Sequence, residues 1–290
     1  MTMINRRHWI AGAGALGFTA ATPLFGQARK SIFDVLERSS GGRLGIAAID
    51  TGNGHRLLWN AQERFALCST FKILLAAAVL VKAQRGDLPL DRQVKFGQAD
   101  LLDYAPVVKA NLAQGGMTVE QLAQAAVELS DNSAANLLLP QVGGPGGLTR
   151  FIREQGDQIT RLDRPEPDLN DVKPDDPRDT TTPGAMVTLM QDLLVGNVLT
   201  PQSREKLIGW MVASRTGDQR LRARLPDDWR VGDKTGTGAH NFNDVAIAYP
   251  PGRKPILIAC YLDAPGLDAE AANKAHQRVG SLVGRLFAQR

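Results

Sequence analysis

The sequence predicts an α/β (α+β) protein whose sheet is assembled from the two ends of the chain. Apolar runs that favour strands lie near the N-terminus and again in the last third, and the stretch between them has the apolar periodicity of helices. The 290 residues are 43% hydrophobic and 22% charged, which is an ordinary globular composition. We therefore expect distant segments to share one sheet, with a helical insert of about 150 residues between them.

The first expected strands form a hairpin. Residues 43–50 and 55–60 are short apolar runs, and the turn sequence Thr51-Gly52-Asn53-Gly54 separates them. Three more apolar runs near the other end of the chain predict strands at 229–234, 243–249 and 255–262. The chain must therefore return to the sheet after the helical insert.

Helical periodicity is clearest at 69–85, where apolar residues share one helical face and Gly86 provides a stop signal. Further helices are expected at 119–129, 148–155, 183–194 and 204–212, and residues 268–288 should pack on the sheet. Residues 161–179 differ, because they hold four prolines, six aspartates and little periodicity. Such a stretch inside a compact domain tends to be functional, with a solvated surface loop as the alternative.

The N-terminus has the features of an export signal. Arg6-Arg7 precede an uncharged run from Trp9 to Phe25, and Gly26-Gln27-Ala28 places small residues before a cleavage site after Ala28. The arginine pair favours the twin-arginine route, with a general-secretion signal as the alternative. No second apolar stretch is long enough to span a bilayer. We expect residues 1–28 to be removed, leaving a periplasmic or secreted monomer with no membrane contact.

Charge, cysteine and histidine usage narrow the function further. The net charge of +4 becomes +2 without Arg6 and Arg7, and this near balance gives no footprint for nucleic acid. Cys68 and Cys260 could form one disulfide, but each lies in an apolar segment of its own, so we expect buried free thiols. The four histidines show no metal-ligand spacing. We predict no metal and no cofactor.

Four short segments occur in the order that an acylating serine hydrolase with its own deacylation base would need. They are Ser69-Thr70-Phe71-Lys72, Ser130-Asp131-Asn132, Glu166-Pro167-Asp168-Leu169-Asn170 and Lys234-Thr235-Gly236. SxxK alone is expected by chance about once in a chain of this length, whereas SDN and KTG are rarer. Their ordered co-occurrence is therefore the evidence for a function.

This motif set resembles the class A serine β-lactamases, which share SxxK, SDN and KTG with penicillin-binding transpeptidases. The likeness runs from about Ile32 to the C-terminus and includes three flanking segments: Phe65-Ala66-Leu67-Cys68, Arg161-Leu162-Asp163-Arg164 and Asp179-Thr180-Thr181-Thr182-Pro183. It implies a five-stranded antiparallel sheet flanked by helices, an all-α domain, and a site in the cleft between them. It also implies an Arg164–Asp179 salt bridge across the loop and a cis peptide at Glu166-Pro167.

The resemblance and the element pattern together give a domain plan. Residues 29–61 and 213–290 would form a discontinuous α/β sheet domain, and residues 62–212 an all-α domain that carries SxxK, SDN and the Glu166 loop. Some family members that hydrolyse carbapenems have a disulfide from the residue before the nucleophile to the second residue after KTG. That position is Gly238 here, so this bridge cannot form.

The resemblance implies hydrolysis of the β-lactam amide of penicillins and cephalosporins through a Ser69 acyl-enzyme, which confers resistance. Ser130 would pass a proton to the leaving nitrogen, and Glu166 would activate a water that Asn170 fixes. Burial favours the neutral amine of Lys72 while nearby carboxylates oppose that shift, so Lys72 and Glu166 both remain candidate acylation bases. Taken alone, the SxxK residues could be a helix cap and a solvated lysine.

The family pattern also assigns substrate contacts. Asn132 would bind the acylamino side chain, Lys234 and Thr235 would hold the substrate carboxylate, and the backbone N–H groups of Thr237 and Ser69 would form an oxyanion hole. Taken alone, SDN could be turn residues before a helix cap at Ser133, and KTG a strand end.

Two assignments have close competitors. Arg220 resembles a family arginine that reaches the carboxylate site, but Arg222 and Arg224 are nearby. Tyr104 matches an aromatic at the cleft rim, with ordinary core packing as the alternative.

Two rival functions share the acylation chemistry. A penicillin-binding D-Ala-D-Ala carboxypeptidase or transpeptidase deacylates β-lactams very slowly, and a non-catalytic β-lactam sensor keeps its adduct. Glu166 with Asn170 argues against the first, and the lack of a membrane anchor argues against the second.

Overall fold

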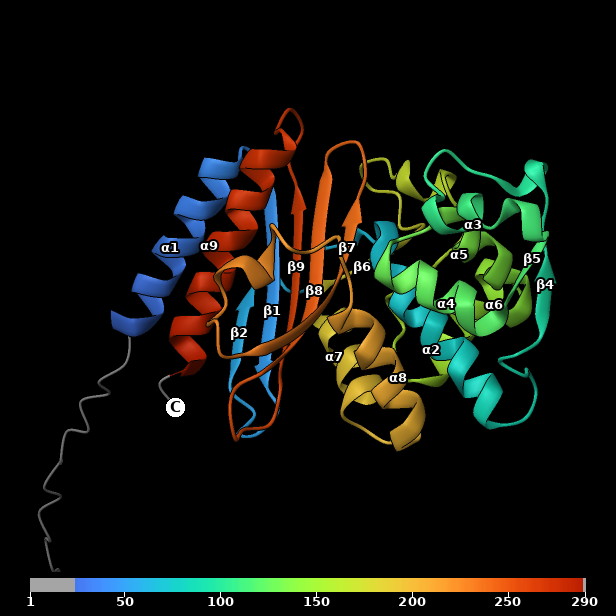
Figure 1. Ribbon diagram of the computed structural model, residues 1–290. Helices are drawn as coiled ribbons and strands as arrows, with labels where there is room; N and C mark the ends of the chain where they lie inside the picture. Colours follow the sequence, from blue (N-terminus) through green and yellow to red (C-terminus); the bar gives the residue numbers. More distant parts are fainter. Residues whose placement is uncertain (1–23, 289–290) are drawn as a thin grey trace, which may run out of the picture.

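The computed structural model describes residues 24–288, and its centre is a five-stranded antiparallel sheet (Figure 1). The strand order is β2-β1-β9-β8-β7, so the first hairpin lies beside the last strand of the chain. The bounds are β1 Arg43–Asp50, β2 Arg56–Trp59, β7 Arg230–Thr237, β8 Asn241–Tyr249 and β9 Ile256–Asp263. The expected α/β (α+β) class and the sheet built from both chain ends are confirmed.

Helices cover both faces of this sheet. In Figure 1, α1 (Leu24–Ser40) and α9 (Ala269–Ala288) lie on one face, and the helical region lies on the other. That region contains α2 Phe71–Gln84, α3 Pro106–Ala110, α4 Val119–Glu128, α5 Asn132–Leu138, α6 Gly144–Glu154, α7 Pro183–Leu194 and α8 Pro201–Val212. The short 3₁₀ turns are η1 Cys68–Thr70, η2 Gln98–Asp100, η3 Leu112–Gln114, η4 Leu139–Val142, η5 Asp168–Asn170 and η6 Leu221–Arg224.

Two short ladders complete the described structure. Strand β3 (Phe65–Ala66) pairs with β6 (Thr180–Thr181), and β4 (Gln93–Lys95) pairs with β5 (Gly116–Thr118). The first ladder joins the segment before Ser69 to the end of the 161–179 loop. No helix within residues 24–288 has both the length and the apolar character needed to cross a membrane.

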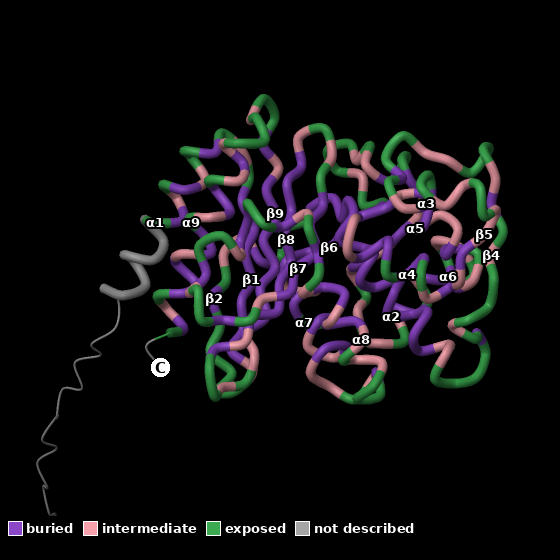
Figure 2. Tube along the Cα trace, in the orientation of Figure 1, coloured by how far each residue is buried: buried purple, intermediate pink, exposed green. Residues whose placement is uncertain are grey.

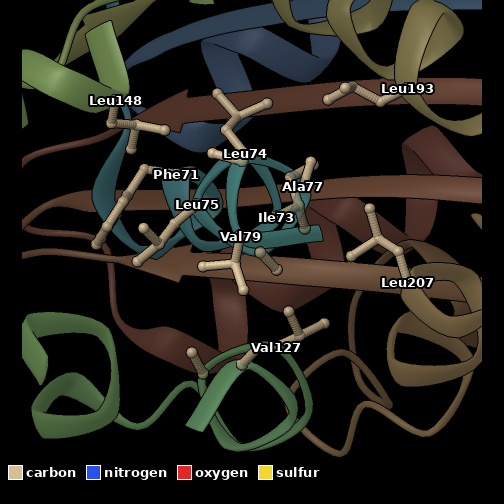
Figure 3. Packing of buried hydrophobic residues seen from close by; sticks show 14 of the residues in the cluster. Phe71, Ile73, Leu74, Leu75, Ala77, Val79, Val127, Leu148, Leu193 and Leu207 are labelled. Atoms are coloured by element: carbon tan, nitrogen blue, oxygen red, sulfur yellow. The ribbon is translucent and has the colours of Figure 1, made fainter. Parts of the chain in front are cut away.

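Burial explains why the sheet strands read as nearly continuous apolar runs. Alternate residues of β8 enter two different cores, Val245 toward the helical region and Ala246 toward α1 and α9. Helix α2 is buried along its first eleven residues, as its all-round apolar sequence requires. Figure 3 shows its side chains among Val127, Leu148, Leu193 and Leu207, which come from α4, α6, α7 and α8. Figure 2 shows that buried residues concentrate in the sheet and in these helices.

The sequence expectations differ from the structure at several boundaries. The helix expected from Ser69 begins at Phe71, because Cys68–Thr70 form a 3₁₀ turn. Helices α1, α3 and α5 were not expected, and the last two are too short for periodicity to reveal. Most of the expected signal segment lies outside the described residues, and residues 24–28 belong to α1. The domain boundaries at 61/62 and 212/213 stay a prediction.

Candidate active site

The turn that carries Ser69 is held on both sides. Cys68 has φ +42°, a left-handed conformation that is strained for a residue with a side chain. The Thr70 hydroxyl donates to Leu67 O at 2.7 Å, and Leu67 N donates to Asp179 O at 2.8 Å. Ser69 is thereby fixed between α2 and the end of the 161–179 loop.

Strand β7 approaches the Ser69 turn backbone to backbone, and Gly236 makes this possible. A Cβ at Gly236 would lie 3.0 Å from Leu67 O and 3.1 Å from Ser69 N. Such contacts are closer than a side chain normally allows, so the glycine of the KTG segment is needed for this packing. Thr237 follows directly, which brings its backbone to the same side as Ser69.

Lys72 lies at the centre of the site and is fully buried. Its Nζ donates to Ser130 O at 2.8 Å and to Asn132 Oδ1 at 2.5 Å, and it lies 3.1 Å from Glu166 Oε1. Burial lowers the pKa of Lys72 below its usual range, although the charge of Glu166 opposes this shift. The sequence left open whether burial or the nearby carboxylates would dominate the pKa of Lys72. In the structure burial has the larger effect.

Glu166 connects the nucleophile to the loop. The Ser69 hydroxyl donates to Glu166 Oε1 at 3.3 Å, and Asn170 Nδ2 donates to Glu166 Oε2 at 2.7 Å. Asn136 on α5 holds the Glu166 backbone from both sides, accepting from its N–H at 3.0 Å and donating to its O at 2.8 Å. Asn170 Oδ1 is buried and has no partner within the described residues.

Asp179 closes the neck of the loop. Its buried carboxylate accepts from Arg164 Nε at 2.6 Å and from the backbone N–H groups of Asp163 and Arg164 at 2.7 and 2.9 Å. The expected Arg164–Asp179 bridge and the expected cis peptide at Glu166-Pro167 are both confirmed. The loop is therefore a fixed element with η5 in its middle rather than a solvated excursion.

Ser130 lies between the two buried lysines. Its hydroxyl accepts from Lys234 Nζ at 2.9 Å and lies 3.5 Å from Lys72 Nζ, and its backbone has φ +57°. Burial lowers the pKa of Lys234 well below its usual range, and the positive charge of Lys72 adds to this effect. Both amines are therefore biased toward losing a proton beside one hydroxyl.

The middle residue of the SDN segment has a structural role. Asp131, rather than Ser133, is the N-cap of α5: its Oδ1 accepts from Ala134 N at 2.8 Å, and its Oδ2 accepts from the N-terminus of α3. Asn132 follows the cap and donates its backbone N–H to Tyr104 O at 3.0 Å. The Tyr104 side chain is 51% exposed, which argues against core packing.

Arg220 reaches the site from behind β7. It donates to Gly236 O at 3.0 Å, to Asn243 O at 2.6 Å and to Thr237 Oγ1 at 2.7 Å, and burial lowers its pKa. Its competitors Arg222 and Arg224 do not share these contacts, because Arg222 pairs with Asp233 and Arg224 is exposed. Thr235 Oγ1 donates to Thr216 Oγ1 at 2.7 Å.

Comparison with known proteins decides the family. Residues 27–287 match the model of the Beta-lactamase enzyme family. The carbapenem-hydrolyzing β-lactamase KPC of Klebsiella oxytoca is 46% identical over 238 residues, which are 81% of each chain. β-Lactamase CTX-M-8 of Citrobacter amalonaticus is 42% identical over 254 residues, 87% of each chain. The solved structure of an ancestral class A β-lactamase superposes with a TM-score of 0.87 at 52% identity, covering 89% of this chain and 100% of that one.

The chain belongs to the class A serine β-lactamase family.

Two residues of this class A enzyme were missed by the sequence reasoning. Asn136 holds Glu166, and Asp131 joins α5 to α3. Asn136 lies four residues after Asn132, one helical turn along α5, and that spacing was the available signal. The sequence could not show that the 161–179 loop packs against this turn.

Neither cysteine of the class A enzyme is bonded. Cys68 and Cys260 are buried free thiols, as expected, and burial raises the pKa of Cys68 to about 12. Cys68 lies close to Gly238, because a Cβ built at Gly238 would lie 3.2 Å from Cys68 Sγ. Within residues 24–288 no group of three or more His, Cys, Asp or Glu side chains could hold a metal ion.

Proposed function

We propose that this enzyme hydrolyses the β-lactam amide bond of penicillins and cephalosporins through an acyl-enzyme on Ser69. One observation carries the proposal: Glu166 Oε1 lies 3.3 Å from Ser69 Oγ and 3.1 Å from Lys72 Nζ. A serine hydroxyl needs a base before it can attack, and its ester product needs an activated water before it can be released. Glu166 lies within reach of both tasks.

In acylation, Lys72 and Glu166 are the two candidate bases. The lowered pKa of Lys72 supports the amine, and the direct hydrogen bond from Ser69 supports the carboxylate. The β-lactam nitrogen must leave with a proton, and Ser130 is the proposed donor. Its hydroxyl can be resupplied by Lys72 or Lys234, which flank it.

In deacylation, Glu166 is the proposed base and Asn170 the proposed positioning residue for the water. Asn170 already donates to Glu166 Oε2, and its free Oδ1 can accept one further hydrogen bond. The Ser69 and Thr237 backbone N–H groups are the proposed oxyanion hole. This pair depends on the close approach of β7 at Gly236.

Substrate contacts follow from the same frame. Lys234, Thr235 and Arg220 are proposed for the substrate carboxylate, Asn132 for the acylamino group and the exposed Tyr104 for packing at the rim. All proposed groups come from one chain, which supports a monomer as the working unit.

The rival functions predict a persistent adduct instead of turnover. A transpeptidase or a β-lactam sensor has no need of a carboxylate hydrogen-bonded to the acylated serine, yet Glu166 is held there by Asn136 and Asn170. Steady-state rates of the purified mature protein on a penicillin, a cephalosporin and a carbapenem test the proposal. Turnover of the first two is expected, and a long-lived stoichiometric adduct without turnover would contradict it. The carbapenem is included because that activity is in the name of the KPC relative.

Arg220→Ala is expected to lower kcat/KM by about 10-fold to 100-fold, the range for losing a charge-assisted hydrogen bond. The guanidinium donates to Thr237 and to the backbone of Gly236. Its removal should therefore weaken the contact with the substrate carboxylate and also loosen the position of β7. Initial rates with several β-lactams give the ratio. Arg224→Ala, at an exposed position on the same segment, is the matched control. Unchanged kcat/KM for Arg220→Ala would move the carboxylate contact to Lys234.

We also propose export by the twin-arginine route, to the periplasm or the medium. Replacing both Arg6 and Arg7 with lysine should retain the protein in the cytoplasm, because that route requires the paired guanidinium groups, while activity in the lysate persists. Cell fractionation followed by an activity assay of each fraction gives the distribution. Normal delivery of the double variant would instead indicate a general-secretion signal.

A further inference from the structure

Two buried carboxyl groups lie behind the KTG strand, and we call them the acid pair: Asp233 on β7 and Asp244 on β8. In the ladder Thr235 is opposite Asp244, so Asp233 and Asp244 are diagonal neighbours whose side chains share one face of the sheet. That face is covered by η6 and α9, because Phe242 and Ala246, which alternate with Asp244, belong to the core formed with those elements. Both carboxyl groups are fully buried.

One oxygen of each carboxyl group holds the start of η6, directly after Arg220. Asp244 Oδ2 accepts from Leu221 N at 3.0 Å, and Asp233 Oδ2 accepts from Arg222 Nε. The segment that leads into η6 packs so tightly that a Cβ at Gly217 would lie 2.2 Å from the Asp233 carboxylate. Arg220 lies inside this segment. The acid pair therefore bonds the two residues that follow Arg220, and Asp233 also packs against Gly217 before it, so the pair borders the segment whose guanidinium contacts Thr237.

The other oxygens have no backbone or guanidinium donor, although the Ser214 hydroxyl lies near Asp233 and opposes the rise that burial causes in the pKa of that carboxyl. Asp233 Oδ1 and Asp244 Oδ1 are both buried, and neither has a hydrogen-bond partner within the described residues. Two ionised carboxyl groups side by side would repel each other in a low dielectric and would each leave an acceptor unsatisfied. A single proton changes this, because a protonated carboxyl is a donor and the remaining carboxylate an acceptor.

The charged neighbours decide which group keeps the proton. Arg222 binds Asp233 directly, whereas the donors of Arg220 are directed to Gly236, Asn243, Thr237 and Asn273. Among the described residues, Lys234 on β7 and Cys260 on β9 also interact with the pair through their charges, and His276 on α9 hydrogen-bonds to Phe242 O, two positions before Asp244 on β8. Burial raises the pKa of Asp244 well above its usual range, and the charge of Asp233 raises it further, against the charge of Arg220. Burial also raises the pKa of Asp233, but the charge and the hydrogen bond of Arg222 oppose that shift directly. The proton therefore belongs on Asp244.

We propose that Asp244 is protonated in the working enzyme and donates a hydrogen bond to Asp233, and that this shared proton positions the segment carrying Arg220. Asp233 and Asp244 are thus positioning residues that act through Arg220 and Thr237. The positioning role rests on the proposed contact between Arg220 and the substrate carboxylate. The assignment of the proton to Asp244 does not depend on that contact.

The proton itself is tested without substrate. Infrared spectra of the wild-type enzyme at neutral pH should contain a carboxylic-acid C=O band that shifts in D₂O. Asp244→Asn should lose this band, and the exposed matched control Asp228→Asn should keep it. The shared proton is refuted if the wild type lacks the band or if Asp244→Asn retains it.

The stability of the same variants gives a second readout. A carboxyl group whose folded-state pKa is raised contributes stability that is fully present below its unfolded pKa and is lost as pH rises through the folded value. The free energy of unfolding of the wild type relative to Asp244→Asn should therefore fall as pH rises above about 4, the unfolded value of the group. A difference that is independent of pH would overturn the assignment of the proton to Asp244.

The positioning role is tested by kinetics. An asparagine can still accept from Leu221 N and donate to Asp233, so Asp244→Asn should stay within about 3-fold of wild-type kcat/KM. Asp244→Ala leaves Asp233 with an unsatisfied oxygen and should lower kcat/KM by about 10-fold to 100-fold. Equal activity of the two variants would overturn the positioning role while leaving the β-lactamase proposal intact. If Asp244→Ala does not fold, Asp244→Asn alone is the test. A decrease of more than about 10-fold in its kcat/KM would overturn the positioning role, and a value within about 3-fold of wild type would support it.

Discussion

Glu166→Ala and Glu166→Gln are expected to accumulate a covalent penicilloyl adduct on Ser69. Glu166 is the proposed base that activates a water against the ester, and removing a general base costs about 100-fold to 10,000-fold in the step that it serves. Glu166 accepts hydrogen bonds from Asn170 and from Ser69, so its carboxylate lies next to the residue that is acylated. Intact-protein mass spectrometry after mixing with a penicillin should show a stoichiometric mass increase that persists.

Controls separate this result from general inactivation. Ser69→Ala should show no adduct, because the acylated oxygen is gone. Glu166→Gln keeps the size of the side chain and its hydrogen bond with Asn170, so it isolates the loss of the base. The rate of adduct formation in the two Glu166 variants also decides the acylation base: a wild-type rate assigns it to Lys72, and a large decrease assigns it to Glu166. Turnover of penicillins by either variant at the wild-type rate would contradict the proposed role of the loop.

Asp179→Ala is expected to destabilise the protein by about 3 kcal/mol, the lower part of the range for removing one partner of a buried ion pair. The lower part applies because Arg164 is partly exposed, whereas Asp179 is fully buried. The loss also frees two backbone N–H groups at the loop neck. Because Glu166 and Asn170 lie on this loop, deacylation should decrease more than acylation.

Thermal unfolding and pre-steady-state rates with a penicillin measure these two effects. Asp171→Asn is the matched control, because it removes a carboxylate of the same loop whose partner Lys173 is exposed, and such pairs contribute little. A variant at Asp179 with an unchanged Tm and an unchanged deacylation rate would show that the neck does not position Glu166.

Several features of the site were readable from the sequence because they depend on local geometry. Ser69 and Lys72 are three residues apart, and Asn170, at the end of η5, lies four residues after Glu166. Side chains three or four residues apart lie on the same side of a helical turn, and Asn170 donates to Glu166 in the structure. The salt bridge between Arg164 and Asp179 was likewise predicted, since the resemblance indicated which loop ends meet.

Other features required the folded chain. The order of β2, β1, β9, β8 and β7 was not fixed by the strand pattern, which only showed that the two ends of the chain share a sheet. Asn136 gained its role because the loop packs on α5, and Asp131 because α3 begins beside it. Neither contact leaves a periodic signal in the sequence.

By itself the sequence determined the fold class, the family and the order of the chemical groups, because motif spacing and apolar periodicity are local properties. The tertiary structure decided the electrostatics. Ser69 meets Glu166 across 97 positions and Lys234 meets Ser130 across 104, so the burial of both lysines exists only after these segments pack. Desolvation depends on every atom that excludes water from a group. No local pattern could therefore state that the pKa of Lys72 falls, or that two aspartates lie side by side behind the KTG strand.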